Sequence, residues 1–175
     1  PSIWSVGIQA DGRLGVPRWE LDATGLPSNN PIPGIVFDPP GRMILAQRGA
    51  VTGAYDYLQL AEGGTSSVVR YKREFPDDPT TPSVWAADPD SYAIGLAEGG
   101  TSASGGIALG YGYNADDNAF SGACSATLWA TGDALRNNPD LTPPVDGPVN
   151  VNGLQGMARS GVRPVNDPAL RAFFA

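Results

Sequence analysis

Hydrophobic and aromatic residues occur along this chain of 175 residues in short runs, separated by stretches rich in Gly, Pro, Asp and Asn. Short runs in which Trp, Tyr, Val and Ile are concentrated are typical of β-strands. They fall into four pairs that predict hairpins: 2–8 with 14–21, 34–38 with 43–47, 67–71 with 83–86, and 106–113 with 126–131. The tight-turn sequences ADGR and PPGR join the first two pairs and favour a reversal of the chain. The pattern therefore predicts an all-β fold of antiparallel hairpins.

Helix is expected only in the C-terminal part of the chain. The 23 Gly and 17 Pro residues disfavour long helices, because Pro lacks a backbone donor and Gly costs backbone entropy. GDALR (132–136) predicts one helical turn, and DPALRAFF (167–174) predicts a short helix with Asp167 as N-cap and Pro168 in the first turn. We therefore divide the chain into strands over residues 1–136 and a Pro-rich extended segment, 137–175, that ends in a short helix.

The seven residues LAEGGTS occur twice, at Leu60–Ser66 and Leu96–Ser102. The copies start 36 residues apart, a spacing typical of structural repeats. Gly-Gly supplies permissive dihedral angles and strand residues follow, so we interpret each copy as a strand entry at equivalent connections of successive repeats. A functional alternative places Glu62 and Glu98 on one rim of the fold, where the two carboxylates would converge on a ligand or an ion.

The segment PGIVFDPPGRMILAQ (33–47) combines a strand, the sequence D-x-x-G-R and a second apolar strand. In this it resembles the blades of NHL and SMP-30-like β-propellers, which often carry a similar hairpin between their inner strands. SIWSVGIQADGRL (2–14) is a looser copy, and GGIALGYGYN (105–114) is similar to an innermost strand. The resemblance covers residues 1–136. It implies about three or four propeller-like blades of four antiparallel strands, in either a small closed ring or an incomplete propeller.

Acidic residues outnumber basic ones by 18 to 11, which gives a net charge of −7. Nucleic-acid-binding proteins carry clustered Lys and Arg, whereas the only basic cluster here is Arg70–Arg73, which we interpret as a solvated strand edge. No apolar run approaches the ~20 residues that span a bilayer. We therefore expect no nucleic-acid partner and no membrane insertion. Gly- and Pro-rich loops on an acidic chain favour an extracytoplasmic protein, either secreted, periplasmic or on the cell surface.

The chain contains no His, which excludes a Ser-His-Asp triad and the usual zinc sites. Its one Cys, Cys124, cannot form an internal disulfide. It is either a buried small hydrophobic residue or the partner of a cysteine outside this segment, to which a disulfide would link it. A catalytic thiolate is disfavoured because no His is present to activate it.

Calcium binding is the metal chemistry that stays open. The loop NADDN (114–118) offers side-chain oxygens at alternating positions, as calcium loops do, which makes Asp116 and Asn118 candidate ligands. Loops rich in Asp and Asn are also common as plain turns between strands. The SMP-30-like resemblance implies an alternative function, a calcium-dependent lactonase. In such an enzyme Glu62 and Glu98 would have to meet Asn114 or Asp116 on the propeller axis.

These observations favour a non-catalytic binding or structural module of a secreted or surface-exposed protein, which presents rim loops to a protein or glycan ligand. No resident cofactor is expected apart from the calcium alternative. The four tryptophans are interpreted as packing residues of the core or between blades: Trp4, Trp19, Trp85 and Trp129. If they instead form an exposed stacking platform, the chain is a carbohydrate-binding module.

Overall fold

A computed structural model of the chain describes ten segments: residues 1–23, 26–27, 29–53, 61–75, 84–95, 100–112, 114, 119–137, 150–160 and 173–174. These residues form ten β-strands and no α-helix. The strands are β1 (Ser2–Ser5), β2 (Arg18–Asp22), β3 (Gly34–Phe37), β4 (Met43–Ala46), β5 (Val68–Arg73), β6 (Trp85–Tyr92), β7 (Ala103–Gly110), β8 (Thr127–Asn137), β9 (Asn150–Ala158) and β10 (Phe173–Phe174). The predicted all-β, antiparallel fold class is confirmed at this level.

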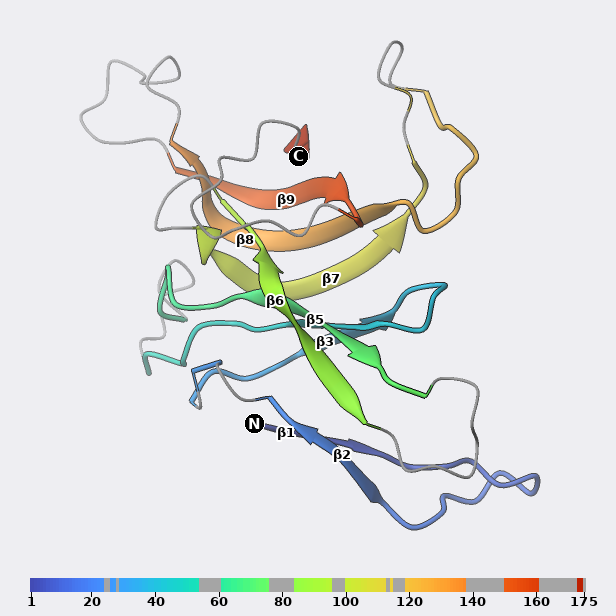
Figure 1. Cartoon of the computed structure of the whole chain (residues 1–175). Coiled ribbons are helices and arrows are strands. Elements are labelled where there is room, and N and C mark those ends of the chain that lie inside the picture. Colours follow the sequence, from blue (N-terminus) through green and yellow to red (C-terminus); the bar gives the residue numbers. More distant parts are fainter. Residues whose placement is uncertain are drawn as a thin grey trace.

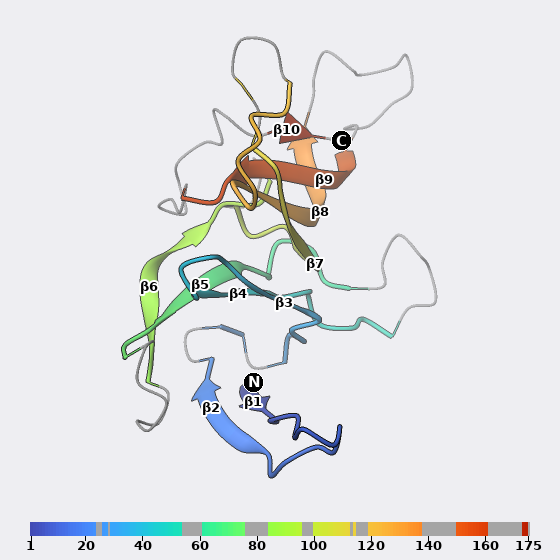
Figure 2. The same cartoon turned by 90° about the vertical axis from the view of Figure 1, so that its right-hand side faces the viewer.

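The strands form three antiparallel sheets, and within each sheet neighbours in sequence are neighbours in space. A two-stranded hairpin, β1-β2, is followed by a middle sheet, β3-β4-β5-β6, and by a C-terminal sheet, β7-β8-β9-β10. The three sheets are stacked in chain order, with the hairpin at one end and the C-terminal sheet at the other (Figures 1 and 2). The described strands do not close into a ring.

All four predicted hairpins are present, as the pairs β1-β2, β3-β4, β5-β6 and β7-β8. In the first two, a Gly of the turn has a φ of 82°, in the left-handed region that favours glycine. These residues are Gly12 and Gly41. The backbone bond from Asp38 N to Arg42 O, 3.0 Å long, closes the second turn. Local turn chemistry therefore sets these reversals, as the sequence indicates.

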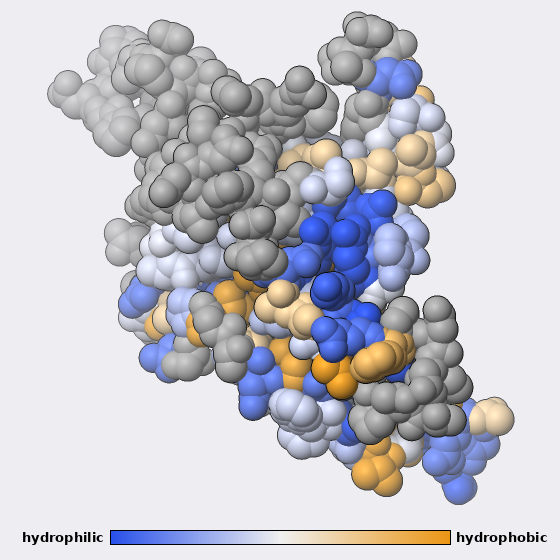
Figure 3. All heavy atoms as spheres, viewed as in Figure 1, coloured by the Kyte–Doolittle hydropathy of each residue, from blue (hydrophilic) through white to orange (hydrophobic). Residues whose placement is uncertain are grey.

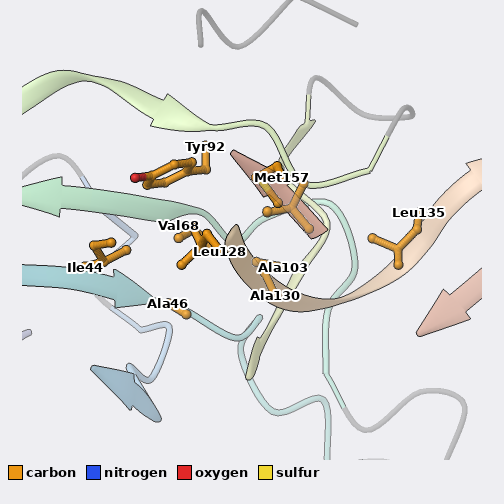
Figure 4. Packing of buried hydrophobic residues seen from close by; sticks show 10 residues of the cluster. Ile44, Ala46, Val68, Tyr92, Ala103, Leu128, Ala130, Leu135 and Met157 are labelled. Carbon is orange, nitrogen blue, oxygen red and sulfur yellow. The ribbon is translucent and has the colours of Figure 1, made fainter. Parts of the chain in front are cut away.

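Strand β4 lies at the centre of the fold, because its side chains enter two hydrophobic cores. Ile44 and Ala46 belong to the core between the middle and C-terminal sheets, together with Leu128 of β8. Met43 and Leu45 point to the opposite face and belong to a second core, between the hairpin and the middle sheet. All four β4 residues are buried, as alternation along a strand covered on both faces requires. Figure 4 shows side chains of both sheets filling the space between them.

The C-terminal part differs from the sequence-based expectation in two places. Strand β8 runs through Gly132–Arg136, so the helical turn predicted there is wrong. Phe173–Phe174 form β10, which pairs with β9, so a helix does not reach Phe174, while residues 167–172 lie outside the described part of the chain. Strand β9 pairs with β8 along its length, and one sheet therefore draws on both sides of the predicted boundary at 136/137. The division at that boundary stays a prediction.

Candidate docking surface on the N-terminal hairpin

One face of the N-terminal hairpin carries a continuous set of apolar side chains. Trp4 pairs with Trp19 near the base of the hairpin, and Ile8 forms a β-bridge with Leu14 near its tip. Successive side chains of a strand point to opposite faces, so residues 4, 6 and 8 share one face with their cross-strand partners. We call this the outer face and define it by six residues: Trp4, Val6, Ile8, Leu14, Val16 and Trp19.

The two valines lie between these pairs. Gly15 N donates to Gly7 O over 2.8 Å, and in the register of this bond and of the Ile8–Leu14 bridge the residue opposite Val6 is Val16. Because Ser5 pairs with Arg18, Pro17 is an extra residue on the second strand at this point. The outer face is therefore three side-chain pairs long. None of its six side chains carries a charge.

All six residues of the outer face are exposed. The exposed fractions range from 39% for Val6 to 89% for Val16, and Trp4 and Trp19 are 58% and 51% exposed. Single exposed apolar residues are common on protein surfaces, whereas contiguous apolar patches mark sites of interaction. In the view of Figure 3, hydrophobic and hydrophilic residues are interspersed in the lower part of the molecule.

A β-bulge in the hairpin keeps Glu20 off the outer face. Ile3 pairs with Leu21 but Trp4 pairs with Trp19, so Glu20 is an extra residue on β2. Without the extra residue, Glu20 would lie opposite Trp4 on the outer face. The bulge instead lets Trp19 join the outer face while Ile3 and Leu21 pack into the second core.

Glu20 anchors the hairpin to the middle sheet. Its residue exposure is only 8%, and its carboxylate accepts hydrogen bonds from Trp85 Nε1 at 3.0 Å, Arg18 Nη2 at 2.9 Å and Ser5 Oγ at 2.5 Å. A buried carboxylate needs such partners, because an unpaired charge in the interior is costly. The inner face of the hairpin is thus fixed to the fold, and the outer face points away from it.

Charged groups flank the outer face at both ends. At the base, Asp22 Oδ1 accepts a hydrogen bond from Ser2 Oγ at 2.6 Å and from Trp19 Nε1 at 3.4 Å. These two hydrogen bonds hold the pKa of the fully exposed Asp22 carboxyl below its usual value. At the tip, Arg13 Nε lies 3.5 Å from Asp11 Oδ2, and both side chains are largely exposed. The apolar face therefore ends in an acidic group at one end and an ion pair at the other.

The described parts of the two LAEGGTS copies lie side by side. Ser66 and Ser102, the last residues of the copies, form a parallel β-bridge in which Ser66 N donates to Thr101 O over 3.0 Å. Thr101 Oγ1 donates to Gly64 O over 2.7 Å. One copy leads into β5 and the other into β7, so the interpretation as strand entries is confirmed.

The two connections are not equivalent, and this part of the interpretation is wrong. β5 is the third strand of the middle sheet, whereas β7 is the first strand of the C-terminal sheet. Glu62 is exposed, and its backbone N donates to Ala50 O over 2.9 Å. Glu98 lies outside the described residues, so the convergence of Glu62 and Glu98 on a ligand stays a prediction.

The candidate calcium ligands Asp116 and Asn118 also lie outside the described residues. Asn114, next to them, is exposed, and its backbone N donates to Ala119 O over 2.9 Å. Within the described ranges, no three His, Cys, Asp or Glu side chains are grouped so that they could hold a metal ion. Calcium binding and the lactonase alternative therefore stay predictions.

The basic run Arg70–Arg73 is not uniformly solvated. Lys72 is exposed as expected, but the Arg70 side chain is only 11% exposed and Arg70 Nε donates to Asp88 Oδ2. Burial lowers the pKa of the Arg70 guanidinium, but the hydrogen bond to Asp88 and the nearby Tyr92 outweigh it, and the net pKa is raised. The interpretation as a solvated edge is wrong for Arg70, because this arginine is paired and stays charged.

Arg70 belongs to a cluster of polar contacts between the middle and C-terminal sheets. Its guanidinium carbon lies 5.8 Å from the centre of the Tyr92 ring, and the Tyr92 hydroxyl donates to the carbonyl oxygen of Arg159, directly after β9. Burial raises the pKa of Tyr92, which keeps the hydroxyl a donor. Arg159 Nη1 in turn lies 3.2 Å from Asp38 Oδ2. The same carboxylate oxygen lies 2.6 Å from Arg42 Nε. We call these six residues the inter-sheet cluster: Asp38, Arg42, Arg70, Asp88, Tyr92 and Arg159.

Cys124 is exposed and has a free thiol, so its interpretation as a buried hydrophobic residue is wrong. It lines a shallow hollow of about 220 Å³ between the ends of β7 and β8, together with Leu109, Gly110, Tyr111 and Ser125. The disulfide to a segment outside this chain stays a prediction, for which exposure of the thiol is a requirement.

No family model, characterised protein or solved structure matches this chain. Among the described residues, no helix has the length and hydrophobicity needed to cross a bilayer. We therefore infer function from the exposed surface of the protein.

Sequence reasoning did not identify the outer face. The sequence predicts packed positions for Trp4 and Trp19, but both residues are more than half exposed. Trp129 is partly buried as expected, because Gly110 and Gly156 let the backbone approach its ring. The missed signal is the alternation of Trp4, Val6 and Ile8 on the first strand, which predicts an apolar face but does not indicate whether that face is covered.

Proposed function

We propose that this chain is a non-catalytic assembly module of an extracytoplasmic protein, and that it docks through the outer face of its N-terminal hairpin. The observation that carries this proposal is the set of six contiguous, exposed and uncharged apolar side chains. Exposure of such a face to water costs free energy, at roughly 25 cal/mol per Å² of apolar surface, and a partner surface would remove that cost. The ligand or partner is therefore a protein with an apolar face of its own.

The stacked sheets support a more specific proposal for the fold, namely that the chain forms propeller-like blades. Propeller blades are four-stranded antiparallel sheets. The middle and C-terminal sheets share this topology and pack against each other through one hydrophobic core. The assignment to NHL or SMP-30-like propellers rests on the hairpin sequences alone.

The proposed docking surface can be tested with a dye that binds exposed apolar patches. At about 0.1 µM protein, where micromolar associations are dissociated, we expect ANS fluorescence to rise with the wild-type chain. The double variant Val6→Ser/Val16→Ser should lose most of this signal. Val51→Ser, at another exposed valine outside the hairpin, is the matched control and should keep it. Equal dye binding by all three proteins would contradict the proposal.

A carbohydrate-binding function is the second candidate, and one observation favours it. Trp4 and Trp19 are paired across the hairpin and more than half exposed, so both rings are accessible for stacking against a sugar ring. With a glycan panel, this function predicts a change in tryptophan fluorescence that Trp4→Ala abolishes. Absence of any change with the wild-type chain would exclude a glycan of the panel as the ligand.

A further inference from the structure

We propose that the outer face binds the outer face of a second copy of this chain, and that the two hairpins stack as an isologous two-fold dimer. This proposal rests on the proposed docking function and names its partner. In such a dimer both copies use the same surface, so the surface has to be complementary to itself after rotation by 180°. The arrangement of the six residues meets this condition.

The order of side-chain pairs along the hairpin makes the outer face self-complementary. The pair Val6 and Val16 lies between the Trp4–Trp19 pair and the Ile8–Leu14 pair. A two-fold axis through the valines places the tryptophans of one copy over Ile8 and Leu14 of the other. Two aromatic rings then face two branched aliphatic side chains, and the small valines face each other where the strands cross.

The charges at the two ends also match after this rotation. Val6 is four residues from Ser2, which pairs with Asp22 at the base, and four residues from Ala10 in the tip. At roughly 3.3 Å per residue, base and tip both lie about 13 Å from the axis. The axis therefore brings Asp22 of one copy to the tip of the other, where Arg13 has a side chain that is 83% exposed. At each end the Asp22 carboxylate of one copy would meet the exposed Arg13 guanidinium of the Arg13–Asp11 ion pair of the other.

The available area is sufficient for a dimer. A fully accessible aromatic side chain offers on the order of 150–250 Å² and an aliphatic one somewhat less, so the six exposed fractions correspond to roughly 700 Å² per copy. Two copies would bury roughly twice that area, which exceeds the ~1,000 Å² expected of a specific interface. We expect a dissociation constant on the order of micromolar.

Sedimentation equilibrium of the whole chain tests the dimer. At tens of micromolar, the wild type should have about twice the monomer mass of 18.1 kDa. Val6→Glu places two like charges at the axis and should weaken association at least about tenfold, and so should Val6→Lys. An equimolar mixture of the two variants should recover the dimer, because unlike charges then meet. Val51→Glu is the matched control and should associate as the wild type does.

A second pair of variants tests the ends of the interface without changing its apolar centre. Arg13→Glu should weaken the dimer, and the addition of Asp22→Arg in the same chain should restore it. Circular dichroism of each variant shows that the fold is retained. Failure of both the Glu/Lys mixture and the charge swap to restore dimers would overturn the two-fold arrangement.

A wild type that remains monomeric at about 100 µM would also overturn the proposal. The ANS experiment then tests the docking function separately from the dimer. If the monomer binds ANS through the outer face, the docking function stands and its partner is another protein. If it does not bind ANS there, the docking function falls as well.

Discussion

Replacement of Asp38 with alanine is expected to lower the free energy of unfolding by about 3–4 kcal/mol. The Asp38 side chain is completely buried and lies 2.6 Å from Arg42 Nε and 3.2 Å from Arg159 Nη1. Its other oxygen, Oδ1, accepts a hydrogen bond from Arg42 N at 2.8 Å. The substitution leaves two guanidinium groups without their acid and one turn amide without its acceptor. Both arginine side chains are about one quarter exposed, so water can solvate them in part. We therefore expect a loss in the lower part of the range of about 3–5 kcal/mol that is typical for removal of one partner of a buried ion pair.

Urea unfolding followed by circular dichroism measures this effect. Asp11→Ala provides a control at another acid of a hairpin turn, whose ion pair with Arg13 is exposed. Exposed ion pairs contribute about 0–1 kcal/mol, so this variant should unfold close to the wild type. Similar losses in the two variants would show that burial does not strengthen the contribution of Asp38.

Replacement of Gly49 with alanine is expected to destabilise the fold by more than about 2 kcal/mol. A Cβ atom at residue 49 would lie 1.8 Å from the backbone oxygen of Glu62 and 2.8 Å from its carbonyl carbon. Both contacts are to backbone, so no side-chain rotation can relieve them. The segments would have to separate, which strains the β-bridge between Val51 and Ala61.

Gly63→Ala is the matched control for this substitution, because Gly63 directly follows Glu62, the residue that Gly49 approaches. A Cβ at Gly63 would meet no atom within 4 Å. Gly63 also lacks a positive φ, so alanine should be tolerated with a change below about 1 kcal/mol. Melting temperatures of the two variants give the comparison. A Gly49→Ala protein as stable as Gly63→Ala would show that this approach of the two segments is not tight.

The hairpins could be predicted from sequence because their determinants are local. Gly12 and Gly41 lie where the turns require left-handed backbone, and the runs on either side have strand composition. Contacts between distant segments could not be predicted in the same way. The pairing of Ser66 with Ser102 depends on how the middle sheet meets the C-terminal sheet, and burial of Arg70 depends on Asp88, eighteen residues away.

The candidate site was only partly readable from sequence for a related reason. Alternation places Trp4, Val6 and Ile8 on one face, but packing decides which face is covered. The bulge at Glu20 is equally hidden, because one extra residue on β2 leaves no signature in composition. Exposed glutamates and Asx-rich loops attract attention as candidate ligands, whereas the surface that emerged consists of residues that usually form a core.

The inter-sheet cluster has a mechanical consequence. Apolar side chains can slide past one another with little resistance, but hydrogen bonds and ion pairs resist shear because they depend on direction and distance. Asp38 and Tyr92 of the middle sheet both contact Arg159 at the end of β9. A pull on the C-terminal sheet should therefore be carried directly into the middle sheet, and from there through Trp85 and Glu20 to the hairpin. We expect the three layers to bear load as one stiff element.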